Sequence, residues 1–213
     1  MGMRFTNLVK LAPGVRLDLP EVGALRGIHL ASPSPYGAPV PQPDLAKHLE
    51  AALHDVQWPR ETNVSFDISS DGTSVILDVD LPEIGDMPTR AASMSALGYH
   101  VAIREMGRFE KQDLYMAHVR GVGFRVIAEV FAALPSVEHV ALSAYSQRVD
   151  RRTGQLGDDY VYAVQVRRHE WARINFAALE SLDVVEALAK FDLWRKKTGP
   201  FTAVELIEER IAA

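Results

Sequence analysis

The chain has 213 residues, of which 47% are hydrophobic and 24% charged, and its net charge is −5. This composition is typical of a folded globular protein, and the negative balance excludes a general attraction to nucleic acid or anionic membranes. The absence of cysteine excludes disulfides and thiolate metal sites and favours a reducing compartment. No apolar run reaches the length of a signal peptide or a membrane span. We therefore expect a cytoplasmic protein with no membrane partner.

Five prolines between Ser32 and Pro43 mark the clearest boundary in the chain. Such a density of proline interrupts helices and strand ladders and favours extended backbone. We expect an N-terminal β-hairpin appendage at 1–31, a proline-rich linker at 32–43 and a main α/β domain at 44–213. In the appendage, two alternating runs flank Ala12-Pro13-Gly14, a tight-turn sequence. Two strands alone are marginally stable, so this hairpin should lean on the main domain or on a partner.

The start of the chain resembles a known family. Phe5 and the run Pro13-Gly14-Val15-Arg16-Leu17 are similar to the opening of uncharacterised bacterial proteins with a short, glycine-rich N-terminal domain of unknown function. The likeness covers about residues 3–30, and Leu19-Pro20-Glu21 departs from the polar residues of that family. The resemblance implies a bacterial source, and it brings no known activity.

Beyond the linker, helical spacing of apolar residues predicts a helix at 44–57 with Asp44 as its N-cap. A β-hairpin should follow, because Asp71-Gly72 between two β-rich runs is a strong signal for a two-residue primed turn. That turn pairs Val64 with Val79, Phe66 with Leu77 and Ile68 with Val75. All three apolar pairs then lie on one face, so the turn and the hydrophobic pattern give the same register.

Downstream, the patterns predict a strand at 99–104, a helix at about 110–134, strands at 137–145 and 160–167, and helices starting at Asp183 and Thr202. Gly121 and Gly123 inside the long helix suggest that a neighbouring backbone packs closely there. The fold class is α/β (α+β), a mixed sheet of about five strands flanked by helices. The order αβββαβ resembles the core of restriction-endonuclease-like folds.

That resemblance implies a Mg²⁺ or Mn²⁺ site built from strand carboxylates and a glutamate of the first helix. The predicted register places Asp67, Asp78 and Asp80 on the hairpin face opposite the apolar one, and Glu50 is the glutamate on the helix. These four are the candidate metal ligands. Asp80 stands where the family has lysine, and no other lysine lies on either strand of the hairpin, so the resemblance does not extend to cleavage. The alternative interpretation is a solvated hairpin face with no ligand.

Arg148, Arg151 and Arg152 lie between the last two strands and are candidate phosphate contacts, which Arg167, Arg168 and Arg173 would extend. The alternative is a flexible loop of mixed charge. Gln165-x-Arg167 is a weakened form of the metal-and-lysine motif, and His118 is expected to be a core histidine. Two functions remain open: a nucleic-acid-associated protein with a degenerate or metal-dependent nuclease-like core, and a non-catalytic protein-interaction or oligomerisation module.

Overall fold

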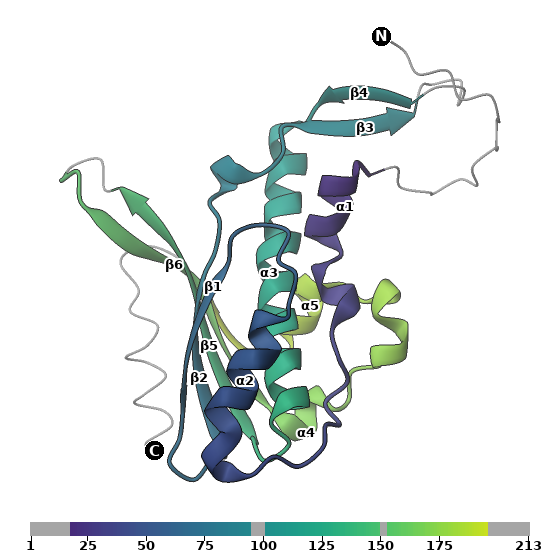
Figure 1. Cartoon of the computed structure of the whole chain (residues 1–213). Coiled ribbons are helices and arrows are strands. Elements are labelled where there is room, and N and C mark those ends of the chain that lie inside the picture. The colour runs from purple at the N-terminus through teal and green to yellow at the C-terminus, as the bar shows by residue number, and fades with distance from the viewer. Residues whose placement is uncertain (1–17, 95–100, 150–152, 196–213) are drawn as a thin grey trace.

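The computed structural model describes residues 18–94, 101–149 and 153–195. Its main sheet has five strands in the order β1-β2-β5-β6-β7. Their bounds are β1 Asn63–Ile68, β2 Ser74–Asp80, β5 His139–Val149, β6 Leu156–Arg167 and β7 Asp192–Arg195. Strands β2 and β5 run parallel, and the other neighbouring pairs run antiparallel. The predicted class, a mixed sheet of about five strands flanked by helices, is confirmed (Figure 1).

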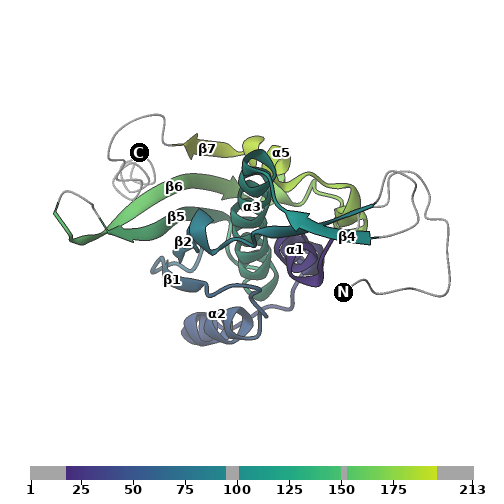
Figure 2. The ribbon, with the colours of Figure 1, turned by 90° about the horizontal axis from the view of Figure 1, so that it is seen from above.

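The long helix α3 (Arg108–Ala133) lies against one face of this sheet. Three further helices contact α3: α1 (Pro20–Arg26), α2 (Leu45–His54) and α5 (Val184–Ala189). Shorter elements are α4 (Arg168–Trp171) and the 3₁₀ helices η1 (Ile28–Ala31), η2 (Gln42–Asp44), η3 (Ile84–Asp86) and η4 (Phe176–Ser181). Figure 2 shows the described helices on one side of the sheet. We call the opposite side the outer face.

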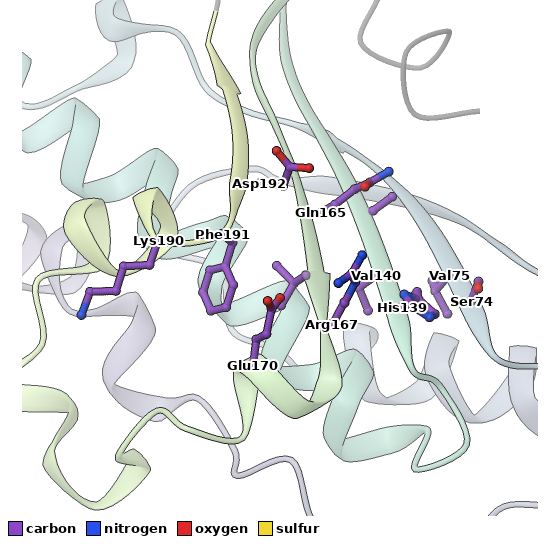
Figure 3. A pocket seen from close by; sticks show the side chains of 12 residues that line it. Ser74, Val75, His139, Val140, Gln165, Arg167, Glu170, Lys190, Phe191 and Asp192 are labelled. Carbon is purple, nitrogen blue, oxygen red and sulfur yellow. The ribbon is translucent and has the colours of Figure 1, made fainter. Parts of the chain in front are cut away.

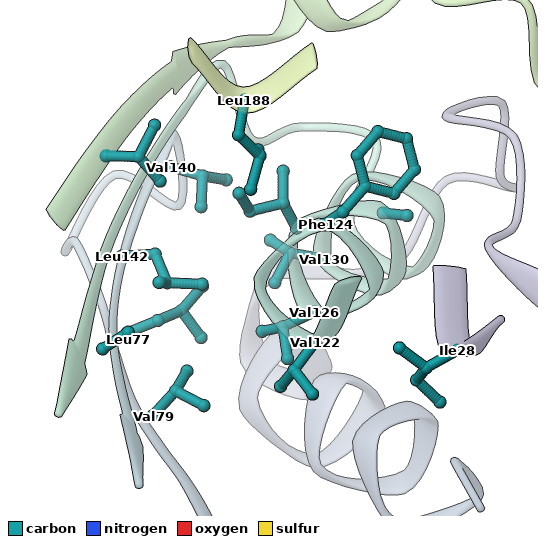
Figure 4. Packing of buried hydrophobic residues seen from close by; sticks show 14 of the residues in the cluster. Ile28, Leu77, Val79, Val122, Phe124, Val126, Val130, Val140, Leu142 and Leu188 are labelled. Carbon is teal, nitrogen blue, oxygen red and sulfur yellow. The ribbon is translucent and has the colours of Figure 1, made fainter. Parts of the chain in front are cut away.

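The core lies between α3 and the inner face of the sheet, as Figure 4 shows. Strand β2 alternates, with Val75, Leu77 and Val79 buried, and its intervening side chains point to the outer face. These valines and the leucine pack with Val122 and Val126 of α3. Burying each such side chain stabilises the fold by about 1.5–3 kcal/mol. The apolar alternation thus determines which side chains of β2 reach the outer face.

Part of the expected N-terminal appendage packs into this same core. Val22 and Leu25 of α1 are buried, and Arg26 forms an ion pair of 3.0 Å with Asp113 of α3. Pro20 stands at the first position of α1, where its missing N–H costs no hydrogen bond. The β-hairpin predicted for this region falls on residues 1–17 and the two that follow, so it lies almost entirely outside the described residues.

The proline-rich segment 32–43 is held against the C-terminal end of α3. A side chain at Gly37 would collide with the carbonyl oxygen of Ala132, so only glycine allows this approach. Arg168 donates from Nη1 to the carbonyl of Pro35 at 2.9 Å. The segment therefore packs on the main core through its backbone.

The predicted hairpin register is confirmed: Val64 pairs with Val79, Phe66 with Leu77 and Ile68 with Val75. The turn type is different from the prediction. Both primed turns, types I′ and II′, need positive φ at the first central residue, and here only the second, Gly72 (φ 70°), is positive while Asp71 is not. Gly72 N–H instead donates to the carbonyl of Ser69, which closes a four-residue loop. The Asp71 carboxylate accepts from the N–H and hydroxyl of Thr73, which favours this loop while preserving the register.

One predicted strand belongs elsewhere. The strand expected at 99–104 is β4 (Val101–Glu105), and it pairs with β3 (Arg90–Met94) in a separate two-stranded sheet. Its side chains from Ala102 to Glu105 are exposed, so this strand lacks an apolar side to bury in the main sheet. Strand β7, which the patterns did not predict, takes the fifth place beside β6. The helix predicted at 44–57 is shorter, and the helix predicted from Thr202 lies outside the described residues.

The two glycines inside α3 make room for side chains, where a close backbone was expected. A Cβ on Gly121 would stand 2.7 Å from Cγ2 of Ile28. A Cβ on Gly123 would collide with the hydroxyl of Tyr162, which donates to the carbonyl of Val119 at 2.9 Å. Gly123 therefore allows a tyrosine of β6 to reach the backbone of α3.

Candidate functional site

The strand register arranges the outward side chains in four rows across the outer face. Successive rows are two residues, or about 6.7 Å, apart, so the four rows extend over about 20 Å. In order from the end near α4, they are Ser74, His139 and Arg167; then Asp67, Ile76, Ala141, Gln165 and Asp192; then Ser65, Asp78, Ser143, Ala163 and Trp194; then Asn63, Asp80, Tyr145 and Tyr160.

Carboxylates gather in the far half of this face. Asp78 and Asp80 lie in this half, and Asp67 borders them from the second row, so the three share the outer face as the sequence predicted. Asp158 of β6 joins them. Burial raises the pKa of Asp78, and the charges of Asp158 and Asp67 raise it further. The pKa of Asp80 is also raised, by burial and then by Asp158 and Glu61. Among the described side chains no ion pair neutralises Asp78 or Asp80, so within this described set their negative charge is uncompensated.

Two buried polar atoms lie side by side within this acidic half. Ser143 is fully buried and pairs in register with Asp78 on the adjacent strand. Neither Oγ of Ser143 nor Oδ1 of Asp78 has a hydrogen-bond partner among the residues described. Leaving a buried polar group unsatisfied costs about 1–3 kcal/mol. Asp78 as a whole is half-buried, so a donor can approach its carboxylate from outside, whereas Ser143 is fully covered.

A pair of tyrosines borders these atoms. The rings of Tyr145 and Tyr160 lie 5.7 Å apart between centroids at an interplanar angle of 51°. Burial raises the pKa of both phenols, and the nearby aspartates Asp80 and Asp78 add to the shift. Both hydroxyls therefore stay protonated at neutral pH. We call Asp78, Asp80, Asp158, Ser143 and the two tyrosines the acidic tyrosine site.

The fourth predicted ligand does not join the aspartates. Glu50 is exposed on α2, which packs with α3 on the helical side of the sheet, whereas Asp78 and Asp80 point to the outer face (Figure 2). In the described part of the chain, no group of three or more histidine, aspartate or glutamate side chains is placed to hold a metal ion. The metal site with Mg²⁺ or Mn²⁺ stays a prediction.

The predicted phosphate contacts fall mostly outside the described residues. Arg151 and Arg152 lie in the gap at 150–152, and Arg148 belongs to β5. Arg168 points inward, where its guanidinium contacts backbone carbonyls, so it does not extend a surface patch. Arg167 reaches the other end of the outer face with Gln165, which places the pair of the weakened motif together. His118 is fully buried, as expected.

A pocket of about 400 Å³ opens at the end of the outer face near α4 (Figure 3). Its polar lining comes from the first two rows, from α4 and from the connection between α5 and β7, and consists of Ser74, His139, Gln165, Arg167, Glu170, Lys190 and Asp192. The sequence reasoning missed this pocket, because its walls meet only when β7 adds to β6. The outer face thus carries two sites of different charge.

Comparison with known proteins adds no assignment. No family model, no curated protein and no solved structure matches this chain. Among the described helices, none has the length and apolar character needed to cross a bilayer. Any function must therefore be argued from the chemistry of the outer face.

Proposed function

We propose that this chain is a non-catalytic binding protein whose acidic tyrosine site captures an arginine-bearing segment of a partner protein. The observation that carries the proposal is the juxtaposition of Asp78 and Ser143. Both present buried oxygen atoms with no hydrogen-bond partner in the described part of the chain. A positively charged donor at the half-buried Asp78 would neutralise this carboxylate and the aspartates around it.

A guanidinium group fits this site better than an ammonium group. It has five N–H donors in a planar fork, which can reach a carboxylate and a neighbouring hydroxyl together. Its flat faces also stack on aromatic rings, and Tyr145 and Tyr160 provide such rings beside the carboxylates. An arginine side chain therefore matches the charge, the donor geometry and the aromatic border of the site.

The same charge argues against a phosphate ligand at this site. Asp67, Asp78, Asp80 and Asp158 would repel a nucleic-acid backbone, whose binding depends on lysine and arginine contacts. A divalent cation remains the main competitor, since carboxylate and hydroxyl oxygens are its usual ligands. The experiment must therefore separate a guanidinium from a metal ion.

The test is fluorescence anisotropy with a labelled hexa-arginine peptide and, in parallel, the same peptide with citrulline in place of arginine. The double variant Asp78→Asn/Asp80→Asn should weaken hexa-arginine binding by about 10- to 100-fold, the effect of losing a charge-assisted hydrogen bond. The matched control is Asp44→Asn/Asp55→Asn, which makes the same change in net charge at exposed positions flanking α2. The citrulline peptide should not bind. Equal losses in both double variants would show general electrostatic attraction and overturn the proposal.

A thermal-shift titration with Mg²⁺ and with Mn²⁺ tests the competitor. A stabilisation by either ion that Asp78→Asn removes and Asp55→Asn retains would assign the site to a metal and replace the present proposal. A single-stranded oligonucleotide that binds the chain more tightly than hexa-arginine does, with Asp78→Asn strengthening it, would favour the nucleic-acid class. Absence of both effects, together with the peptide result, supports the arginine site.

A further inference from the structure

The pocket near α4 is separate from the acidic tyrosine site and has its own chemistry. It lies where β7 leaves β6: Gln165 and Asp192 are the last residues that these strands pair, and the chain then turns away through Phe191 and Lys190. Its volume of about 400 Å³ is within the range of pockets that enclose small molecules. Asp78 and Asp80 do not line it.

Basic groups stand on one wall of this pocket. His139 and Arg167 are partners across β5 and β6, and both side chains are exposed to the pocket. Within the described ranges, no hydrogen bond or ion pair engages the Arg167 guanidinium. The adjacent Arg168, by contrast, donates four hydrogen bonds to backbone carbonyls. The end of β6 thus has one arginine that holds the fold and one that is available to a ligand.

A carboxylate faces the pocket from another element. Glu170 of α4 lines the pocket with Arg167, yet no ion pair within 4.0 Å joins the two among the described residues. Opposite charges that share a cavity without contact leave space for a ligand with both charges. Figure 3 shows Lys190 extending away from the other labelled side chains, so the positive side of the pocket rests on Arg167 and His139.

Apolar side chains complete the lining. Phe191 is half-buried and contributes hydrocarbon surface, whereas Val140 and Val166 line the pocket with only 1% of their surface exposed. Ser74 and Gln165 supply neutral donors and acceptors. Pockets that bind small molecules combine an apolar lining with a few convergent polar groups in this way. The ligand should therefore have an apolar part as well as its charges.

We infer that this pocket binds a small zwitterion of the amino-acid class. The carboxylate of the ligand pairs with Arg167 and His139, its ammonium group pairs with Glu170, and its side chain contacts Phe191. A guanidinium binds a carboxylate through two parallel hydrogen bonds, which gives orientation as well as affinity. Glu170 would repel a purely anionic ligand, and Arg167 would repel a purely cationic one. A zwitterion is therefore the class of ligand that pairs with both residues.

The experiment is isothermal titration calorimetry of the full chain with L-leucine and with L-phenylalanine, each at up to about 10 mM, ten times a millimolar Kd. Arg167→Met and Glu170→Gln should each weaken binding by about 10- to 100-fold, because each removes one charge-assisted contact. The matched controls are Arg173→Met and Glu180→Gln, at exposed positions outside the pocket lining, which should leave affinity unchanged. Leucine methyl ester, which lacks the carboxylate, and N-acetyl-leucine, which lacks the ammonium group, should fail to bind.

Three results would overturn the inference: no heat of binding with either amino acid, binding that Arg167→Met leaves unchanged, or equal binding of N-acetyl-leucine. The last of these would assign the pocket to organic anions. The outcome is independent of the proposed function, since Asp78→Asn/Asp80→Asn should leave amino-acid binding intact and Arg167→Met should leave hexa-arginine binding intact.

Discussion

Arg168 is the residue whose removal should most clearly destabilise the fold without touching either candidate site. Its guanidinium donates to the carbonyls of Val137 (2.5 Å), Pro35 (2.9 Å), Phe131 (3.1 Å) and Leu134 (2.6 Å). It also stacks over the ring of Phe131 at 4.7 Å. The Arg168 side chain therefore connects the start of α4 with the end of α3 and with the proline-rich segment.

The expected loss follows from these contacts. A hydrogen bond to a charged group contributes about 1.5–3 kcal/mol, and the contributions are not additive. Arg168 is half-buried, so water can reach part of the site and satisfy some of the freed carbonyls. Burial lowers the pKa of Arg168, which means that keeping its charge inside already costs free energy. We expect Arg168→Met to lower the free energy of unfolding by about 3–5 kcal/mol, which corresponds to the loss of roughly two charge-assisted hydrogen bonds once water satisfies the other carbonyls.

Urea denaturation and calorimetry measure this loss. For a chain of this length, the melting temperature should fall by about 6–20 °C, at 2–4 °C per kcal/mol. Arg167→Met at the neighbouring exposed position is the matched control and should change stability by no more than about 0.5 kcal/mol. Arg168→Lys should recover only part of the loss, because one ammonium group cannot reach four carbonyls. If Arg168→Met and Arg167→Met unfold at the same urea concentration, the assignment of Arg168 as a structural connector is wrong.

Three further outcomes are expected. Gly123→Ala should lower stability by about 2–3 kcal/mol in urea denaturation because its methyl group displaces the Tyr162 hydroxyl, whereas Gly85→Ala, with no atom within 4 Å, should not. Burial lowers the pKa of His118 from 6.5 to about 4, so the unfolded chain takes up a proton at this residue before the folded chain does. The free energy of unfolding is therefore unaffected by His118 above pH 6.5 and falls by about 3 kcal/mol as the pH is lowered to 4. His118→Phe should make stability less dependent on pH over that range. The pKa of Asp78 is raised by burial, which means that the ionised carboxylate destabilises the fold. Asp78→Asn should therefore raise the melting temperature at pH 7, and acidification should remove the difference between this variant and the unmodified chain.

The fold was predictable where local chemistry and burial agree. In β1 and β2 the turn residues and the apolar alternation give one register, and the structure has that register although the turn differs. Strand β7 was not predictable in this way, because Asp192 to Arg195 is a short run of mixed character after a helix. It becomes a strand by pairing with β6, which is a long-range contact that periodicity does not report.

The candidate site was predictable in part for the same reason. Asp67, Asp78 and Asp80 share a face because alternation within a hairpin is local. Ser143 and Asp158 join them only because β5 pairs with β2 and β6 pairs with β5, which depends on the crossover through α3. The placement of Glu50 on the helical side also depends on which surface of the sheet α2 covers, and no pattern within α2 specifies that surface.

The helical layer and the acidic tyrosine site are connected through a β-bulge. Between Ala144 and Tyr145 the register of β5 and β6 shifts by one residue, so Ala144 pairs with Tyr162 and Tyr145 with Tyr160. Two residues that are two positions apart on a regular strand point to the same face. The extra residue of the bulge changes this, so Tyr162 points inward while Tyr160 points outward beside Tyr145.

The inward tyrosine fixes the position of this bulge. Tyr162 is fully buried, donates to the carbonyl of Val119 and lies under the guanidinium of Arg120 at 3.8 Å. This contact exists because Gly123 leaves room for the hydroxyl. Gly123→Ala should therefore disturb the Tyr145 and Tyr160 pair on the opposite face, and its effect on hexa-arginine binding should exceed that of an equally destabilising core substitution such as Leu49→Ala, at a residue that packs in the core through α2.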